Sequence, residues 1–364
     1  LYRPAFDASD ETAIAQVLSS GWVAMGGEPV HRFEQAIKTH TGVAHAVATH
    51  NATAGLDLAL KAIGIGPGDL VITQANTFIA PVNAIAYQGA TPFFIDVDID
   101  TLGMSPQALS TFFEHECEQR DGRLVWRATQ QRVAACLPVH VLGLPCRITE
   151  IRALCDAMQV PVLEDAAEAL GSAWHDGTSM RPCGSLGQVG VISFNANKIV
   201  TTGSGGMVLT DDQTLAQTIR HWSRVAKVPH PYRTEFDAVG YNYGMPAMNA
   251  ALGLAQWSKF DRIMASKKAL AQRYRDLCGK HSGVRMAEPI EGAISNDWMT
   301  AMIFDQADVA EGFVKATRDQ GVLTRPLWQP LHQSRVYHNA PRSDLSHTEW
   351  LAKHIVQLPS APSL

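Results

Sequence analysis

One lysine stands at a point where an amine can do chemistry. Lys198 ends the string SFNANK (residues 193–198), after a short apolar run and before a glycine-rich turn. An amine at such a turn can face a cleft, and partial desolvation or nearby positive charge makes it nucleophilic near neutral pH. The aldehyde of pyridoxal phosphate is a suitable partner for that amine. The alternative interpretation is an exposed loop lysine without a chemical role.

The carboxylates of Asp165 and Glu168 lie at and just after the end of another expected strand. The string EDAAE (residues 164–168) places Asp165 at the carboxyl end of the run Val160–Asp165, the edge at which α/β sheets bind ligands. An aspartate there can stabilise the protonated pyridine nitrogen on which the electron-sink chemistry of pyridoxal phosphate depends. The two alanines leave room for a flat ring, and Glu168 is placed to meet the ring hydroxyl. An acidic helix N-cap is the alternative interpretation of this string.

The remaining parts of such a site are a phosphate cradle and a stacking ring. The string HNATAGL (residues 50–56) lies between the expected strand Ala44–Thr49 and a helix expected from near Thr53. A helix N-terminus offers unpaired N–H groups and a partial positive charge, worth ~0.3–1 kcal/mol toward an anion. The hydroxyl of Ser193 can add a donor. Phe78 can stack on the pyridine ring, with core packing as the alternative.

These residues require a sheet whose strand ends meet at one edge. Short β-rich runs alternate with helical patterns at Ala44–Thr49, Leu70–Thr73, Thr91–Val97, Ala134–Val139, Val160–Asp165, Val189–Phe194 and Met207–Thr210. That alternation predicts an α/β fold with a mostly parallel sheet covered by helices on both faces. The pattern changes after Pro231, where the expected elements are helices at 248–257, 258–279 and 309–319 and extended runs at 299–304 and 322–327. We therefore expect a large cofactor-binding domain over residues 1–245 and a smaller α+β domain over residues 246–364.

Composition and charge exclude several classes of protein. The 364 residues carry 30 Lys and Arg against 35 Asp and Glu, a formal net charge of −5, which offers no field to attract nucleic acid or an anionic membrane. Six unevenly spaced cysteines favour reduced core thiols, and 14 irregularly spaced histidines predict no metal site. The sequence shows neither a long apolar run nor a signal peptide, so the expected location is the cytoplasm.

Five strings, in order along the chain, resemble those of the DegT/DnrJ/StrS family of sugar aminotransferases. They are NATAGL, TFIAPVNAI, EDAAE, SFNANKIVTTGSGGM and GYNYGMPAMNAALG, beginning at residues 51, 77, 164, 193 and 240. The similarity extends from about residue 20 to residue 260. SFNANK, TRPLWQPLH (residues 324–332) and Gly21-Trp22-Val23 look closest to one branch. That branch aminates C4 of UDP-linked 4-keto-6-deoxy-N-acetylhexosamines in bacillosamine and legionaminic acid biosynthesis.

The resemblance implies a fold-type-I homodimer that binds pyridoxal 5'-phosphate in active sites shared between two subunits. Lys198 would form the Schiff base with the cofactor, and Asp165 would pair with its pyridine nitrogen. Glu168 occupies a position where other branches have Gln or His. The residues implied to bind phosphate are Thr53, Ala54 and Ser193, and Asn242 from the other subunit. The residues implied to line the sugar site, with ordinary packing as the alternative, are Trp22, Arg325, Trp328 and His332.

The implied reaction has two halves and ping-pong kinetics. L-Glutamate gives its amino group to the cofactor, with Lys198 as the base that moves the proton from Cα. The amino group then passes to the C4 ketone of a nucleotide-linked sugar, such as UDP-2-acetamido-2,6-dideoxy-hexos-4-ulose, in polysaccharide or lipopolysaccharide biosynthesis.

Alternatives to this activity stay open. A 3-aminotransferase acting on a dTDP- or GDP-keto-sugar is one, because substrate pose decides the regiochemistry. A sugar dehydratase of the same fold has His at the Lys198 position, and a non-catalytic regulator would have no need of Lys198 and Asp165. The chain departs from the family strings at Gly244, where Arg is usual, and at Ala196, where Gly is usual. Another residue must supply any charge that an arginine at position 244 contributes.

Overall fold

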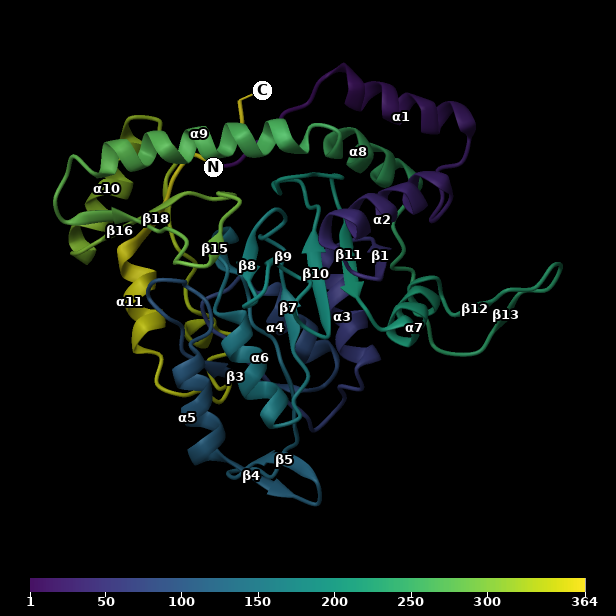
Figure 1. Ribbon diagram of the computed structural model, residues 1–364, viewed down its shortest axis with the longest axis horizontal. Helices are drawn as coiled ribbons and strands as arrows, with labels where there is room; N and C mark the ends of the chain where they lie inside the picture. Colours follow the sequence, from purple (N-terminus) through teal and green to yellow (C-terminus); the bar gives the residue numbers. More distant parts are fainter. Residues whose placement is uncertain (364) are drawn as a thin grey trace.

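The computed structural model describes residues 1–363, and its centre is a layer of mostly parallel strands (Figure 1). One sheet has the order β1-β11-β10-β7 and another the order β3-β2-β6. Parallel bridges between Cys136 and Val162 and between Val139 and Asp165 place β6 beside β7, so the two sheets form one continuous layer. The strands are β1 (His45–Thr49), β2 (Leu70–Gln74), β3 (Thr91–Ile95), β6 (Val133–Cys136), β7 (Leu163–Asp165), β10 (Val189–Ser193) and β11 (Gly206–Thr210).

The direction of these strands confirms the predicted α/β sheet. Strand β2 is parallel to β3 and β6, and β7 is parallel to β10, whereas β11 is antiparallel to both of its neighbours. Strands β2, β10 and β11 are buried at every residue, as expected for a sheet covered on both faces. Each expected run forms a strand, with ends that differ by a few residues.

Helices between the strands begin at recognisable caps. Asn51 caps α3, Asp212 caps α7, and Ser105 accepts from the amide of Ala108 at the start of α5, as the Ser-Pro pair predicts. The helices of this part are α1 (Ala8–Ser20), α2 (Glu28–Thr41), α3 (Ala52–Ala62), α4 (Ala80–Tyr87), α5 (Pro106–Glu116), α6 (Ile148–Ala157), α7 (Gln213–Ser223) and α8 (Ala247–Trp257), with the short 3-10 helix η1 (Val141–Gly143). Helix α8 packs against α1 and α2.

A second, antiparallel sheet forms from the last third of the chain. Its order is β14-β16-β18-β17, and residues from its strands and from α9 and α10 form a separate hydrophobic cluster. Its elements are α9 (Phe260–Cys278), β14 (Val284–Met286), β16 (Ala301–Phe304), α10 (Ala307–Asp319), β17 (Arg325–Pro326), η2 (Leu331–Gln333), α11 (Ser346–His354) and β18 (Ile355–Gln357). The domain boundary near residue 245 stays a prediction.

Three small β structures were not expected from the sequence. Strands β4 (Cys117–Arg120) and β5 (Arg123–Trp126) form a hairpin, and β8 (Ala173–His175) pairs with β9 (Met180–Pro182) and β15 (Ala293–Ile294). The third is the hairpin of β12 (Lys227–Val228) and β13 (Glu235–Phe236), which extends away from the body of the molecule (Figure 1).

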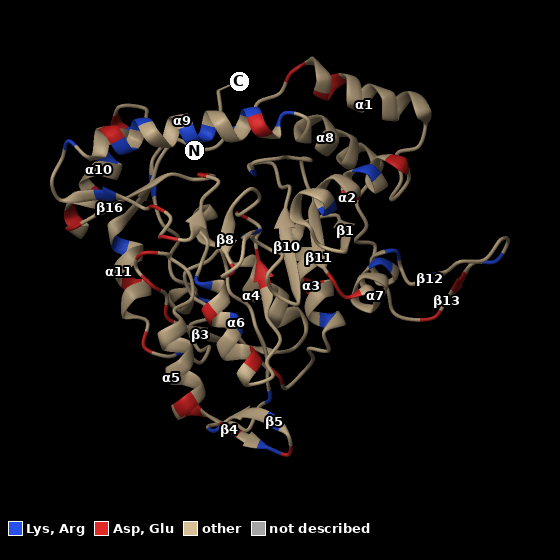
Figure 2. Cartoon of the chain, viewed as in Figure 1, with Lys and Arg blue, Asp and Glu red and all other residues tan. Residues whose placement is uncertain are grey.

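The cysteines follow the sequence-based expectation. All six cysteines are free and buried. Basic and acidic residues are interspersed along the outer elements in the view of Figure 2, so this view shows no extended area of one sign. Over residues 1–363, every helix is too short or too polar to cross a membrane.

Candidate active site

Lys198 lies in a turn that begins where strand β10 ends. Its backbone amide donates to the carbonyl of Asn195 at 2.9 Å, which closes the turn. The Lys198 side chain is 12% exposed, and its Nζ lies 3.4 Å from Oε1 of Glu168. The residue is therefore a nearly buried amine beside a carboxylate, and the alternative of an exposed loop lysine does not describe it.

Glu168 is buried, and a hydrogen bond holds its second carboxylate oxygen. Oε2 accepts a hydrogen bond from the amide of Leu142 at 2.8 Å. Leu142 has a φ of 57°, a left-handed conformation that is rare for leucine and typical of constrained functional sites. Burial raises the pKa of Glu168, and the positive charge of Lys198 opposes that rise. The Glu168 carboxyl is thus fixed beside the Lys198 amine.

Glu164 and Asp165 are neighbours at the end of β7, and their carboxylates differ in the number of hydrogen bonds that they accept. Glu164 is bound by His140 Nε2 at 2.9 Å and by three backbone amides at 2.5 to 2.9 Å. Burial opposes its ionisation, but these bonds hold the pKa of Glu164 below the ordinary value. Asp165 accepts from the amide of Ala167 at 3.0 Å, and burial raises the pKa of Asp165 to about 6. A cationic group beside Asp165 would stabilise its anion.

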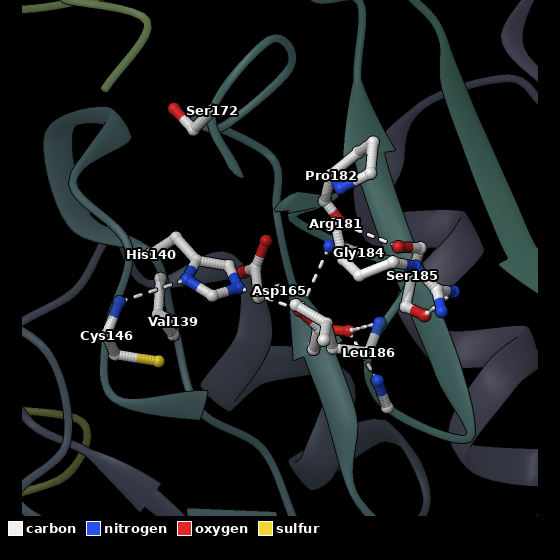
Figure 3. Close-up of polar contacts among 12 residues, drawn as sticks. Val139, His140, Cys146, Asp165, Ser172, Arg181, Pro182, Gly184, Ser185 and Leu186 are labelled. Carbon is white, nitrogen blue, oxygen red and sulfur yellow. Dashed lines mark hydrogen bonds and ion pairs between the residues drawn. The ribbon is translucent and has the colours of Figure 1, made fainter. Parts of the chain in front are cut away.

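His140 fixes the end of the strand that carries Asp165 (Figure 3). Its backbone amide donates to the Asp165 carbonyl at 3.1 Å, and the Cys146 amide donates to its Nδ1 at 3.2 Å. Because Nδ1 accepts, the ring proton is on Nε2, which donates to Glu164. Both ring nitrogens are occupied, so His140 is a structural residue, in agreement with the interpretation of the scattered histidines.

Ser193 and the first turn of α3, both expected to bind phosphate, lie on either side of Gly206. Gly206 of β11 pairs with Thr49 of β1 on one side and with Ser193 of β10 on the other. A Cβ at Gly206 would lie 2.6 Å from the amide nitrogen of Ala52, so a glycine lets β11 pass directly against the first turn of α3. Ser193 is therefore paired with the residue that passes against the positive end of this helix.

Within that first turn, two of the expected donors differ. The amide of Ala54 donates to Oδ1 of Asn51 at 2.8 Å and is therefore already paired. The amide of Thr53 belongs to the first helical turn, whose N–H groups have no acceptor within the helix. Thr53 and Ser193 are thus the more available donors for an anion.

Phe78 and Asn242 lie at the rim. The ring of Phe78 follows β2 and is 57% exposed, which excludes core packing within this chain. Asn242 is exposed, and the segment that follows it runs along the loop before α3, because the His50 amide donates to the Tyr243 carbonyl at 2.6 Å. Both residues face outward from a single chain.

The residues expected to bind the sugar are dispersed. Arg325 lies close enough to Glu168 for its charge to oppose the raised pKa of that carboxyl. His332 is nearly buried, and its Nε2 lies 3.0 Å from Oε1 of Glu349 on α11, whereas Trp328 packs against the main core. Trp22 is 58% exposed and lines a separate cavity of about 1000 Å³ between α1, α2 and α8. Arg325 is the member of this set that the structure brings near Lys198.

Two residues beside Lys198 were not predicted from the sequence. Trp298 contacts its amine, and Asn296 bonds the backbone of Glu168. Both belong to the string SNDW (residues 295–298), just before β16. A polar string with one tryptophan before a strand is a weak signal, because nothing in the sequence indicates that it folds back onto residues 168 and 198.

The buried cluster fits pyridoxal phosphate. Asp165, a buried carboxyl with a raised pKa, would hold the proton on the pyridine nitrogen, and the α3 N-terminus would bind the phosphate. Bound there, the cofactor supplies an aldehyde for the Lys198 amine and an electron sink for the pair released from a C–H bond. Across residues 1–363, the structure contains no group of three or more His, Cys, Asp or Glu side chains that could hold a metal ion.

A buried lysine and aspartate at the carboxyl edge of such a sheet, with a helix N-terminus beside them, define a fold-type-I pyridoxal-phosphate enzyme. The chain belongs to the DegT/DnrJ/EryC1/StrS aminotransferase family, whose profile matches residues 4–364.

Individual relatives agree with this assignment. EpsN, named as a pyridoxal phosphate-dependent aminotransferase of Bacillus subtilis (strain 168), is 33% identical over 93% of this chain and 83% of its own. GDP-perosamine synthase of Escherichia coli O157:H7 is 32% identical over 100% of this chain and 93% of its own. The crystal structure of DesI with its TDP-sugar product has a TM-score of 0.84 and 31% identity, covering 99% of this chain and 86% of DesI. The predicted sugar aminotransferase, its cofactor and its fold type are confirmed.

Proposed function

We propose that this protein transfers the amino group of L-glutamate to the C4 ketone of a nucleotide-linked 4-keto-6-deoxy sugar. The observation that carries the proposal is the nearly buried amine of Lys198, 3.4 Å from Glu168 and on the same sheet edge as Asp165. The strings shared with the UDP-sugar branch favour UDP-2-acetamido-2,6-dideoxy-hexos-4-ulose as the substrate. GDP- and dTDP-linked keto-sugars are the second candidates, since GDP-perosamine synthase is similar over the whole chain.

In this proposal the three side chains divide the work. Lys198 removes the proton from Cα of the donor and returns one to C4 of the sugar, so that it serves as base and then acid. Glu168 holds the lysine amine in place between these steps. Asp165, as an anion, stabilises positive charge on the pyridine nitrogen and so favours release of the proton.

Two arginines line a cavity beside Lys198 and favour binding of an anionic substrate. Arg318 and Arg325 line a cavity of about 340 Å³ together with Asn197, the residue before Lys198, and none of the lining side chains is acidic. Guanidinium groups bind carboxylates and phosphates. Both proposed substrates carry such groups, because L-glutamate has two carboxylates and a nucleotide sugar has a diphosphate. We assign Arg325 and its neighbour Arg318 to substrate binding on this basis.

We also propose that the enzyme works as a homodimer with shared sites. Several apolar side chains stand exposed on one chain, including Phe78 and the hairpin-region residues Tyr232, Phe236 and Val239 at 82%, 60% and 79%. A second copy would cover them, and its Asn242 would reach the phosphate bound by this chain. Gly244 lies two residues after Asn242, where space is limited, since a Cβ there would lie 2.9 Å from Sδ of Met25. An arginine at position 244 would therefore require Met25 to move.

Mixed dimers test the shared site. Lys198→Ala and Asn242→Ala each impair both sites of their own homodimer, but a hybrid of the two has one site with Lys198 and Asn242 intact. Co-refolded mixtures should recover about a quarter of wild-type activity, the value for one intact site in half of the dimers. Activity no higher than the mean of the two parent variants would contradict sharing through Asn242.

The substrate is tested by following each half-reaction in the cofactor absorbance. L-Glutamate alone should convert the bound cofactor to its amino form, and the correct keto-sugar should convert it back. UDP-, GDP- and dTDP-linked 4-keto sugars are offered in turn, and NMR of the product locates the new amino group. Recovery with a GDP-sugar alone would replace the proposed nucleotide, and an amino group at C3 would replace the proposed position. The cytoplasmic location and the role in polysaccharide biosynthesis remain predictions.

A further inference from the structure

Trp298 lies against the amine of Lys198. Nζ is 3.9 Å from the centre of the Trp298 ring, and the tryptophan is only 2% exposed. The same amine is 3.4 Å from Oε1 of Glu168. It is therefore held between a carboxylate and the face of an indole, and both attract a cation.

The indole also fixes the backbone that carries the lysine. Its Nε1–H donates to the carbonyl of Asn197 at 2.6 Å. One side chain thus touches the reacting nitrogen and holds the peptide group just before Lys198. A tryptophan that only filled space would need neither contact.

Asn296 anchors Trp298 to the loop of Glu168. Its Nδ2 donates to the carbonyls of Glu168 and Leu170 at 2.8 and 2.9 Å, and its Oδ1 accepts from the Trp298 amide at 2.8 Å. The fit is tight, because a Cβ at Gly143 would lie 1.9 Å from Oδ1 of Asn296. Trp298, Glu168 and Lys198 are therefore held in one hydrogen-bonded frame, although about 100 residues separate Trp298 from Lys198.

We infer that Trp298 is a positioning residue for the proton transfers of Lys198. Neutral Lys198 takes the proton from Cα of the donor: its lone pair forms the new N–H bond, and the electron pair of the broken C–H bond passes to the bound cofactor. Lys198 is left as an ammonium group. It then gives a proton to the carbon atom that is protonated in the following step, and becomes neutral again. The indole face stabilises the ammonium group and closes one side of the space in which it can move.

The chain offers a matched control for the structural part of this role. Trp174 is also buried, at 7% exposed, and its Nε1–H donates to Oγ1 of Thr149 at 3.0 Å. It packs in a different hydrophobic cluster from Trp298. Trp174→Phe therefore removes a comparable buried indole without touching Lys198.

The first test uses the cofactor-loaded enzyme. Trp298→Leu should lower kcat by about tenfold to thirtyfold, the range expected when a desolvated cation loses an aromatic face, with little change in KM for L-glutamate. The kinetic isotope effect with Cα-deuterated glutamate should rise, because proton transfer becomes slower relative to other steps. Trp298→Phe keeps a ring face and should show both changes at smaller size. Trp174→Phe should show neither.

The second test uses the cofactor-free protein and no substrate. Brief acetylation followed by peptide mass spectrometry should show faster modification of Lys198 in Trp298→Leu, and to a lesser extent in Trp298→Phe, than in wild type or Trp174→Phe. The inference rests on Lys198 being the proton carrier of the proposed function, but this measurement would be unaffected by a wrong choice of sugar. Labelling rates and isotope effects equal to those of Trp174→Phe would overturn it. If Trp298→Leu does not fold, Trp298→Phe decides on the same two readouts.

Discussion

The inner site and its rim are built in opposite ways. Glu168 and Asp165 are buried, and the Lys198 side chain is 12% exposed. Hydrogen bonds within the segment after β7, within the turn after β10 and from η1 hold them in place. At the rim, the ring of Phe78 is exposed, and the hairpin β12–β13, which extends away from the body of the molecule, has exposed aromatic rings as well (Figure 1).

In the proposed homodimer, the difference separates the parts of the site that one chain completes from those that a second chain would complete. Groups that move protons must be fixed before substrate arrives, because small displacements reduce the rate strongly. Groups that contact a large substrate or a second subunit can remain exposed until that partner binds. We therefore expect substitutions in the inner site to abolish chemistry, and substitutions at the rim to alter affinity.

The largest effect is expected at Lys198. Lys198→Ala removes the proposed base and nucleophile together and should lower kcat by a factor on the order of 10,000. Steady-state assay with the best sugar from the absorbance test measures it. An external amine such as methylamine should restore part of the rate. A loss of less than tenfold would mean that another group moves the proton.

A smaller loss is expected at Asp165. Asp165→Asn preserves shape but removes the negative charge that we propose stabilises the pyridine nitrogen, so kcat should fall by roughly 100- to 1000-fold. Cofactor content from absorbance serves as the control, because unloaded enzyme would give the same loss for a different reason. Full activity in a loaded Asp165→Asn variant would contradict the expectation that substitutions in the inner site abolish chemistry.

The stability of the cofactor-free protein should respond to pH through the same residue. The pKa of Asp165 is about 6 in the folded chain against 3.8 ordinarily, so the folded state favours the protonated carboxyl. Its stabilising contribution is complete below about pH 4 and is lost as pH rises through 6, a change of ~3 kcal/mol. Chemical denaturation should therefore show wild type losing stability relative to Asp165→Asn between pH 4.5 and 7.5. Parallel pH profiles would contradict the raised pKa.

The smallest effect is expected at the rim. Phe78→Leu removes a ring that can stack on the cofactor, worth about 0.5–1.5 kcal/mol, or roughly threefold to tenfold in cofactor affinity. Cofactor titration followed by fluorescence measures this change. The melting temperature of the cofactor-free protein should change little, because the ring of Phe78 packs in no core of its own chain. A large drop in melting temperature would show instead that Phe78 has a structural role.

Much of the inner site could be predicted from the sequence because it lies on local patterns. Asp165 is the last residue of the buried strand β7, and Lys198 lies in the turn after the buried strand β10. The carboxyl end of a strand in an α/β sheet is a known place for ligands. Trp298 could not be found in this way, because its contact with Lys198 depends on how the segment before β16 folds back onto the loops after β7 and β10. The same limit applies to Trp22, whose position depends on packing among α1, α2 and α8.

The most direct test of the central claim is the position of the lysine–cofactor bond. Borohydride reduction of the loaded protein makes that bond permanent, and peptide mass spectrometry then locates the added mass. The account predicts one modified peptide, with the cofactor on Lys198, and no modification after prior conversion with L-glutamate. Attachment at another lysine, or no attachment in a protein that has bound the cofactor, would contradict the assignment of Lys198.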